Sequence, residues 1–368
     1  MRSKVLFILH VPPPIHGAAM VGKYISESFL INSTFNTKFI NLGTSLSVDE
    51  IGDVGLSKFL RFFNILWKVF VSLIKFKPDV VYMTPSVSKK GIFKDLIVVL
   101  LIKSFGKKLV YHFHNKGVVN NQNSKLYHYL YKIFFNDVYV ILLSRFLYSD
   151  VKKYVPENKV LICPNGIPKI SNSFVRPKKE GNDKVNLLFL SNLIESKGIF
   201  ILLDACKDLI QRGMTFRCNL VGGEGDISIK QLKQKIIDLD LENYVYYLGK
   251  RYGEDKNEIF LNSDIFVFPT FNETFGLVNL EAMQFRLPIV STNEGGIPDI
   301  VEDGETGFIV QKKDHFALAD RLLQLIENED LRVEMGRRGE LKFLNKFTTD
   351  IFEKNFTKIL LDILKSSI

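Results

Sequence analysis

Two successive series of strand-like and helix-like segments constrain the fold of this chain more than any other feature. In the first series, segments of helical pattern separate the short apolar runs KVLFILHV, TKFINLG, KPDVVYMTPS, KKLVYHFHN and DVYVILLS. The second series has the runs VNLLFLSNL, TFRCNLVGG, YVYYLGK, DIFVFPT, LPIVSTN and GFIV. Strands that alternate with helices predict parallel sheets joined by right-handed crossovers.

A polar stretch, KISNSFVRPKKEGNDK, separates the two series and predicts a linker over residues 173–184. We expect an N-terminal domain over 1–172, a C-terminal domain over 185–345, and a final helix over 346–368 that packs back on the first domain. The predicted fold class is α/β, with two facing Rossmann-like doubly wound parallel-sheet domains and a central cleft. Ligands of open parallel sheets bind beyond the carboxyl ends of the strands, which would line that cleft.

The net charge indicates which kind of binding partner the protein has, and the cysteines indicate its cellular compartment. The formal net charge of +9 favours an anionic partner, such as nucleotide phosphates or acidic lipids. Nucleic acid is less favoured, because the basic residues do not alternate with aromatics in a recognised motif. Cys163, Cys206 and Cys218 are scattered, which argues against disulfides and zinc and favours the cytoplasm. The apolar run near the start is too short for a signal peptide, and we expect a first strand there.

Two glutamates, Glu273 and Glu281, flank the start of the helix predicted after the run DIFVFPT. The free N–H groups at a helix N-terminus favour an anion, and carboxylates accept hydrogen bonds from hydroxyl groups. A ligand that meets both needs carries phosphates and several hydroxyls, as a sugar nucleotide does. The alternative is an ordinary capped helix with two surface glutamates.

The segment PTFNETFGLVNLEAM, followed by LPIVSTNEGGIPDIVEDGETGFIV, resembles the C-terminal signature of the retaining glycosyltransferases of family 4, the glycosyl transferases group 1. That family has the GT-B fold. The segments CPNGIP, LFLSNLIESKG and HGAA resemble three further family motifs. The resemblance covers most of the C-terminal half and little of the N-terminal half. It implies that residues 185–345 form the nucleotide-sugar-binding domain and residues 1–172 the acceptor-side domain.

By this resemblance, Glu273 and His114 are the catalytic residues. Glu273 would lie near the reacting centre of the transferred sugar, and His114, in YHFHN, would contact the sugar or the acceptor hydroxyl. Glu281 would hold ribose hydroxyls, and Lys197 would place a cation at the leaving diphosphate. The donor-binding set is Gly17, Asn192, Lys197, Arg251, Gly276, Leu277, Glu281, Gly295 and Gly296.

Asn192 departs from the family pattern, which usually has Arg in the motif GRL. An amide cannot supply the charged bidentate fork of Arg, so either another cation substitutes at the phosphates or the phosphates are held more weakly. Arg251 is our sequence-based candidate for that role. Gly295 and Gly296 would let the chain pass beside the donor, or they form a plain strand-to-helix turn.

The resemblance implies a retaining glycosyltransferase that moves a sugar from a nucleotide-diphosphate sugar to a hydroxyl of a glycan or lipid-linked acceptor. The implied setting is bacterial cell-surface polysaccharide or glycolipid synthesis, with no cofactor and no metal ion. Two alternatives stay open. One is a nucleotide-sugar epimerase or another enzyme of the GT-B fold; the other is a non-catalytic partner at the membrane surface.

Residues 57–77 predict an unusual helix. Its polar positions, among them Lys58 and Arg61, fall within about 120° of arc at about 100° per residue, and the rest is apolar. Such a helix can pack one side on a sheet and press another side into an anionic bilayer surface, which would place the protein at the inner face of the cell membrane. The alternative is a helix buried between the sheet and its neighbours.

Overall fold

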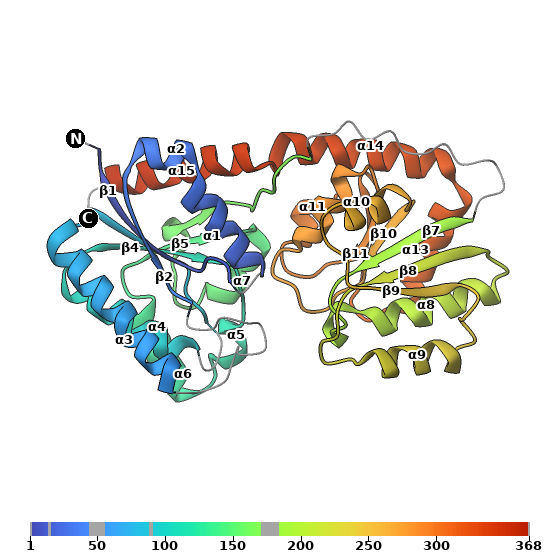
Figure 1. Ribbon diagram of the computed structural model, residues 1–368, viewed down its shortest axis with the longest axis horizontal. Helices are drawn as coiled ribbons and strands as arrows, with labels where there is room; N and C mark the ends of the chain where they lie inside the picture. The colour runs from blue at the N-terminus through green and yellow to red at the C-terminus, as the bar shows by residue number, and fades with distance from the viewer. Residues whose placement is uncertain (1, 14–15, 44–55, 88–90, 171–183, 367–368) are drawn as a thin grey trace. The chain divides into compact units, whose positions relative to one another are not determined.

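The computed structural model divides the chain into two compact units (Figure 1). The first unit is Met1–Gly166 with Thr349–Ile368, and the second is Ile167–Thr348. The described residues are 2–13, 16–43, 56–87, 91–170 and 184–366. Residues 173–183 of the predicted linker therefore lie outside the described residues.

The first unit is built on a six-stranded parallel sheet with the strand order β2-β1-β3-β4-β5-β6. Its strands are β1 Lys4–Leu9, β2 Asn36–Asn41, β3 Val80–Met83, β4 Lys108–Phe113, β5 Tyr139–Leu142 and β6 Val160–Ile162. The central strands are apolar on both faces, because helices cover both sides of the sheet. The order reverses between β1 and β3, which makes the carboxyl ends of these two strands the topological switch point.

The helices of the first unit divide between the two faces of this sheet. They are α1 Gly17–Glu27, α2 Phe29–Thr34, α3 Leu56–Val71 with a π-helical extension η1 Ser72–Phe76, α4 Gly91–Ser104, α5 Val118–Asn121, α6 Lys125–Phe134, α7 Tyr148–Val151 and α15 Thr349–Lys365. Right-handed crossovers from β2 to β3, β3 to β4 and β4 to β5 run in the same direction, so α3, α4 and α6 share one face. Figure 1 shows α1, α2 and α15 on the other face.

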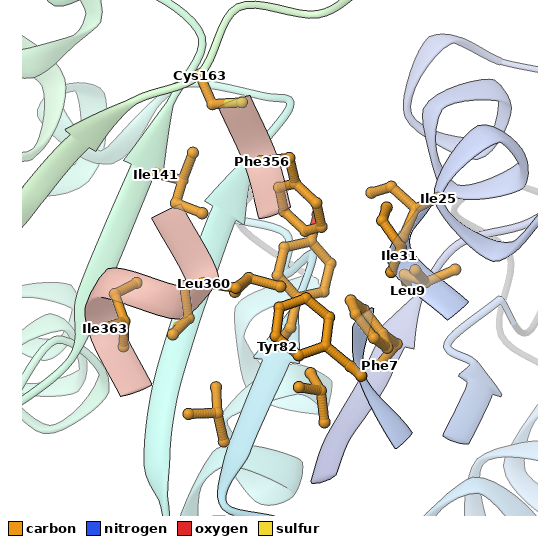
Figure 2. Close-up of a cluster of buried hydrophobic side chains, with 14 of the residues drawn as sticks. Phe7, Leu9, Ile25, Ile31, Tyr82, Ile141, Cys163, Phe356, Leu360 and Ile363 are labelled. Carbon is orange, nitrogen blue, oxygen red and sulfur yellow. The ribbon is translucent and has the colours of Figure 1, made fainter. Parts of the chain in front are cut away.

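The last helix of the chain is part of the core of the first unit. Phe356 of α15 lies with its ring centroid 5.1 Å from that of Tyr82, which in turn lies 5.3 Å from Phe7 of β1. Figure 2 shows this cluster, with Leu360 and Ile363 packed beside the aromatic rings. Burying each such side chain stabilises a fold by about 1.5–3 kcal/mol, so α15 is an integral element of the unit.

The second unit has its own six-stranded parallel sheet with the order β12-β11-β10-β7-β8-β9. Its strands are β7 Val185–Leu190, β8 Phe216–Val221, β9 Val245–Gly249, β10 Ile265–Phe268, β11 Ile289–Thr292 and β12 Gly307–Val310. Its helices are η4 Glu195–Lys197, α8 Ile199–Gln211, α9 Ile229–Asp238, α10 Gly253–Leu261, α11 Leu277–Gln284, α12 Ile297–Ile300, α13 His315–Glu327 and α14 Glu329–Lys346. This is the strand order of the dinucleotide-binding Rossmann fold, and its switch point lies between β7 and β10.

The two parallel sheets confirm the predicted α/β class with two Rossmann-like domains. The facing arrangement and the central cleft stay predictions. Among the described helices, none has both the length and the apolar character required to cross a bilayer.

Candidate functional site

The loops that follow β7 and β10 meet at the switch point of the second sheet. Ser196, in the first loop, accepts hydrogen bonds through its carbonyl oxygen from the Thr270 hydroxyl at 2.9 Å and from the Phe271 N–H at 2.9 Å. The next residue, Lys197, lies with Nζ 2.8 Å from Oε2 of Glu273. The fold thus brings together the lysine and the first glutamate of the predicted site.

The carboxylate of Glu273 is held in one orientation. Its Oε1 accepts hydrogen bonds from the backbone N–H groups of Thr274 at 2.8 Å and Phe275 at 3.4 Å, while Oε2 faces Lys197. The Lys197 and Glu273 side chains are 21% and 20% exposed, so both remain accessible to a ligand. The pair therefore presents a fixed anion and a fixed cation side by side.

Helix α11 begins directly after this carboxylate. Gly276 caps it with φ 87°, and Leu277 is its first residue. The first turn contains no acidic side chain. Because the first N–H groups of a helix have no intrahelical partner, this end of α11 favours an anion. Lys197, Glu273, Gly276 and Leu277 thus gather around one helix N-terminus.

The loop after β11 packs against the same region. Gly295 has φ 54°, and a Cβ at this position would lie 2.3 Å from the carbonyl oxygen of Glu273. A side chain cannot fit at that distance, so a glycine is required here. The Gly296 N–H donates to the carbonyl oxygen of Thr274 at 2.8 Å, and the buried Glu294 pairs with Lys312 at 2.7 Å. These contacts fix the loop beside Glu273.

Glu281 lies on α11 and has a partner that the sequence did not indicate. Nζ of Lys256, on α10, lies 3.0 Å from both carboxylate oxygens of Glu281. The two side chains are 25% and 29% exposed. Lys256 orients the carboxylate and offsets its charge, while the remaining lone pairs stay accessible for hydroxyl groups.

Asn192 lies after β7 and is exposed. In space it lies near Lys250, the residue directly after β9. A Cβ built on Gly223 would lie 3.2 Å from Cδ of Lys250 and 3.6 Å from Oδ1 of Asn192, so both side chains flank the same glycine. The Lys250 ammonium lies 5.1 Å from the centroid of the Tyr252 ring. Arg251, the predicted replacement cation, is exposed and has no hydrogen bond or ion pair with any residue that the structure describes.

The first unit carries a group of histidines at its own switch point. His10 follows β1, and its Nδ1 lies 3.3 Å from the hydroxyl oxygen of Thr84, which follows β3. The ring centroid of His16 lies 6.0 Å from that of His10, and Nδ1 of His16 accepts the Ala19 N–H and so caps α1. Gly17, the first residue of α1, is exposed. The predicted Gly17 site thus lies beside two histidines.

His114 follows β4, and its ring centroid lies 4.3 Å from that of His112. Both ring nitrogens of His114 are inaccessible to solvent and have no hydrogen-bond partner among the described residues. Desolvation, assisted by repulsion from His16, lowers the pKa of His114 to about 3. Desolvation, with repulsion from Lys94 and from the neighbouring histidines, lowers the pKa of His10 to about 3. Both imidazoles are therefore neutral at pH 7 and can each accept and donate one hydrogen bond.

The described residues contain no group of three or more His, Cys, Asp or Glu side chains placed to hold a metal ion. The expectation that the reaction needs no metal remains a prediction. Without a metal ion, a phosphate could be bound by lysine side chains and by the backbone N–H groups at helix N-termini.

Comparison with known proteins gives this geometry a context. Residues 171–342 match the family model described as "Glycosyl transferases group 1". This segment, in the C-terminal half of the chain, is thus similar to the glycosyl transferases group 1. The family resemblance of the C-terminal half is thereby confirmed.

Two relatives of this chain have names that place them in polysaccharide synthesis. The capsular polysaccharide biosynthesis glycosyltransferase CapM of Staphylococcus aureus is 30% identical over 222 residues, which are 57% of each chain. The amylovoran biosynthesis glycosyltransferase AmsK of Erwinia amylovora is 28% identical over 211 residues, 54% of this chain and 51% of that one. The chain thus spans about half the length of these relatives.

Solved glycosyltransferase structures share the whole fold. Anabaena HepE, in complex with UDP and glucose, superposes with a TM-score of 0.70 at 18% identity, over 98% of this chain and 100% of that one. The lipopolysaccharide outer core galactosyltransferase WaaB superposes with a TM-score of 0.75 at 16% identity, over 98% and 99% of the two chains. These likenesses confirm the predicted GT-B class of fold.

Proposed function

We propose that this protein is a retaining glycosyltransferase that moves a sugar from a nucleotide-diphosphate sugar to a hydroxyl of a glycan or lipid-linked acceptor. The Lys197–Glu273 pair, 2.8 Å apart at the N-terminus of α11, is the observation that carries the proposal. The names of CapM and AmsK support a role in bacterial cell-surface polysaccharide or glycolipid synthesis. The complex of HepE with UDP-glucose supports a nucleotide-diphosphate donor.

The donor would bind along the N-terminal end of α11. Its diphosphate would accept hydrogen bonds from backbone N–H groups near Gly276 and Leu277, and Lys197 would supply the adjacent positive charge. Glu281, oriented by Lys256, would accept hydrogen bonds from the ribose hydroxyls. Glu273 would accept hydrogen bonds from hydroxyls of the transferred sugar, with Gly295 and Gly296 passing beside it.

In the transfer step, the bond between the anomeric carbon and the phosphate oxygen breaks, and the electron pair stays on that oxygen. The acceptor oxygen forms the new bond to the anomeric carbon on the same face, and its proton passes to the departing phosphate. Lys197 and the N–H groups of α11 would lower the barrier, because they would place positive charge close to the oxygen on which negative charge develops. His114 would contact a hydroxyl of the sugar or the acceptor only after its ring nitrogens become accessible, because both are inaccessible to solvent in this structure.

Replacing Glu281 with alanine should weaken donor binding by about 10- to 100-fold, because hydrogen bonds to a charged group contribute roughly 1.5–3 kcal/mol. The turnover number at saturating donor should change much less. Isothermal titration calorimetry measures the affinity. Glu340→Ala is the matched control, because Glu340 pairs with Arg286 at 2.7 Å on another surface of the same unit. Equal donor affinity in the two variants would exclude Glu281 from the site.

Lys250 lies beside Asn192 and would supply the cation that this amide cannot. Replacing Lys250 with alanine should therefore weaken donor binding about tenfold at low salt. The loss of affinity should be smaller at high salt, because salt screens a charge near the surface. Arg251→Ala is the neighbouring control and should change the affinity by no more than about twofold. The reverse result, a large effect at Arg251 and none at Lys250, would support Arg251 as the cation that compensates for Asn192.

The activity itself is tested with UDP-, GDP- and ADP-sugars and lipid-phosphate acceptors. The proposal predicts transfer only when an acceptor is present, and a product whose anomeric configuration, read by NMR coupling constants, equals that of the donor. An inverted product would overturn the retaining assignment. A rearranged nucleotide sugar formed without acceptor would identify an epimerase instead.

A further inference from the structure

Helices α3, α4 and α6 expose large hydrophobic side chains on the outer surface of the first unit. The side chains that carry the inference are 44% to 64% exposed, and we call them the aromatic face: Phe59, Phe63, Trp67, Phe93, Ile97 and Tyr129. Solitary exposed hydrophobic residues are ordinary, but a contiguous group marks an interaction surface.

These side chains share one surface because of helical spacing and packing. Phe59, Phe63 and Trp67 recur every four residues on α3, whereas Ile65 and Val69 on its other side are buried. The ring of Phe93, on α4, lies with its centroid 6.0 Å from that of Tyr127 on α6, so these two helices are in contact. Helix α3 packs beside α4, and all three lie on the face of the sheet away from α15 (Figure 1). The alternative of a buried helix over 57–77 is therefore wrong.

The same helices are basic. Lys68, Lys125 and Lys132 are exposed. The one acidic residue within α3, η1, α4 and α6 is Asp95, which is buried and accepts the Ser86 N–H at 2.7 Å. An aromatic surface with lysines around it, and no exposed acid on its own helices, is complementary to an anionic surface.

We propose that the aromatic face docks the first unit on an anionic phospholipid bilayer. The aromatic rings would enter the boundary between headgroups and acyl chains, while the lysines contact the headgroup phosphates. A second copy of this chain is a poorer occupant, because a symmetric contact would place the lysines of one copy against those of the other. The inference goes beyond the proposed transfer reaction and does not depend on it.

Trp67 is the only tryptophan of the chain, so intrinsic fluorescence reports on this face directly. With vesicles of phosphatidylglycerol and phosphatidylcholine, the emission should shift to shorter wavelength and be quenched by lipids brominated on their acyl chains. Vesicles of phosphatidylcholine alone should give a much smaller shift. An unchanged spectrum with anionic vesicles, or equal shifts with both compositions, would overturn the proposal.

Variants that keep Trp67 as the reporter locate the contact. The double substitution Phe59→Ser and Phe63→Ser should lower the vesicle partition coefficient by at least about tenfold. Phe29→Ser is the control, because Phe29 is 86% exposed on α2, on the other face of the sheet, and its loss should change nothing. Circular dichroism verifies the fold of each variant. Equal losses in both variants, or a concentration-dependent dimer that itself shifts the Trp67 emission, would contradict membrane docking.

Discussion

Replacing Lys197 with alanine is expected to lower kcat/KM for sugar transfer by about 10²- to 10³-fold while the second unit stays folded. Lys197 is the cation beside the N-terminus of α11. In the proposed site, its loss would leave the carboxylate of Glu273 next to the departing diphosphate without a compensating charge. Glu273 keeps the hydrogen bonds from the N–H groups of Thr274 and Phe275, so the loop itself should persist. Initial rates with radiolabelled donor, together with circular dichroism, separate activity from folding.

Lys207→Ala is the matched control for that experiment. Lys207 pairs with Asp240 at 2.9 Å in the same unit, but on α8 rather than at the carboxyl ends of the strands. Its loss should leave the rate within about twofold, as for most exposed ion pairs. A Lys197→Ala enzyme with a rate close to that of the control would show that the leaving-group charge is stabilised elsewhere.

Lowering the pH from 7 to 5 is expected to destabilise the first unit. The folded-state pKa values of His10 and His114 are lowered from 6.5 to about 3, so the unfolded chain binds protons first as the pH falls. The stabilising effect of the neutral histidines is complete above about pH 6.5 and declines toward pH 3. At pH 5 the loss is roughly 2 kcal/mol for each histidine, reduced where the two titrations interact.

Urea denaturation followed by the fluorescence of Trp67 measures this loss, because the chain's only tryptophan lies in the first unit. The double variant His10→Gln and His114→Gln should show a smaller decrease between pH 7 and pH 5 than the unmodified protein. NMR titration of the histidine ring protons gives an independent result. Histidine signals that all titrate near pH 6.5 would contradict the buried, neutral state of His10 and His114.

Much of the fold could be predicted because parallel strands buried on both faces appear as uninterrupted apolar runs. The runs DIFVFPT and LPIVSTN became β10 and β11. The family motifs also placed Lys197 and Glu273 on the loops after β7 and β10. The Rossmann strand order then makes these loops neighbours, which explains why two residues that the sequence assigned to one site lie 2.8 Å apart.

The contacts that the sequence did not indicate depend on how helices pack. Lys256 reaches Glu281 only because α10 lies beside α11, and no spacing rule connects a lysine on one helix to a carboxylate on the next. The sequence did not single out Lys250, whose side chain lies with that of Asn192 beside Gly223, because β9 and β7 are far apart in the chain. His10 was missed because its position directly after β1 was the only signal.

For a similar reason, the amphipathic pattern of α3 could not decide whether the apolar side of this helix is buried or exposed. The pattern defines an apolar arc, but a wide arc can be covered by neighbouring helices or exposed to solvent. The exposure of Phe63 and Trp67 depends on where α4 packs, a long-range property that local periodicity does not contain.

Calorimetric titration of the protein with UDP-, GDP- and ADP-sugars is the most direct test of the proposed donor site at the N-terminus of α11. A CMP-sugar, with its single phosphate, serves as the comparison. We expect saturable heat from at least one diphosphate donor, little from the CMP-sugar, and a large loss of affinity in both Lys197→Ala and Glu281→Ala. Absence of heat from every diphosphate donor, or unchanged affinity in these two variants, would contradict the proposed site.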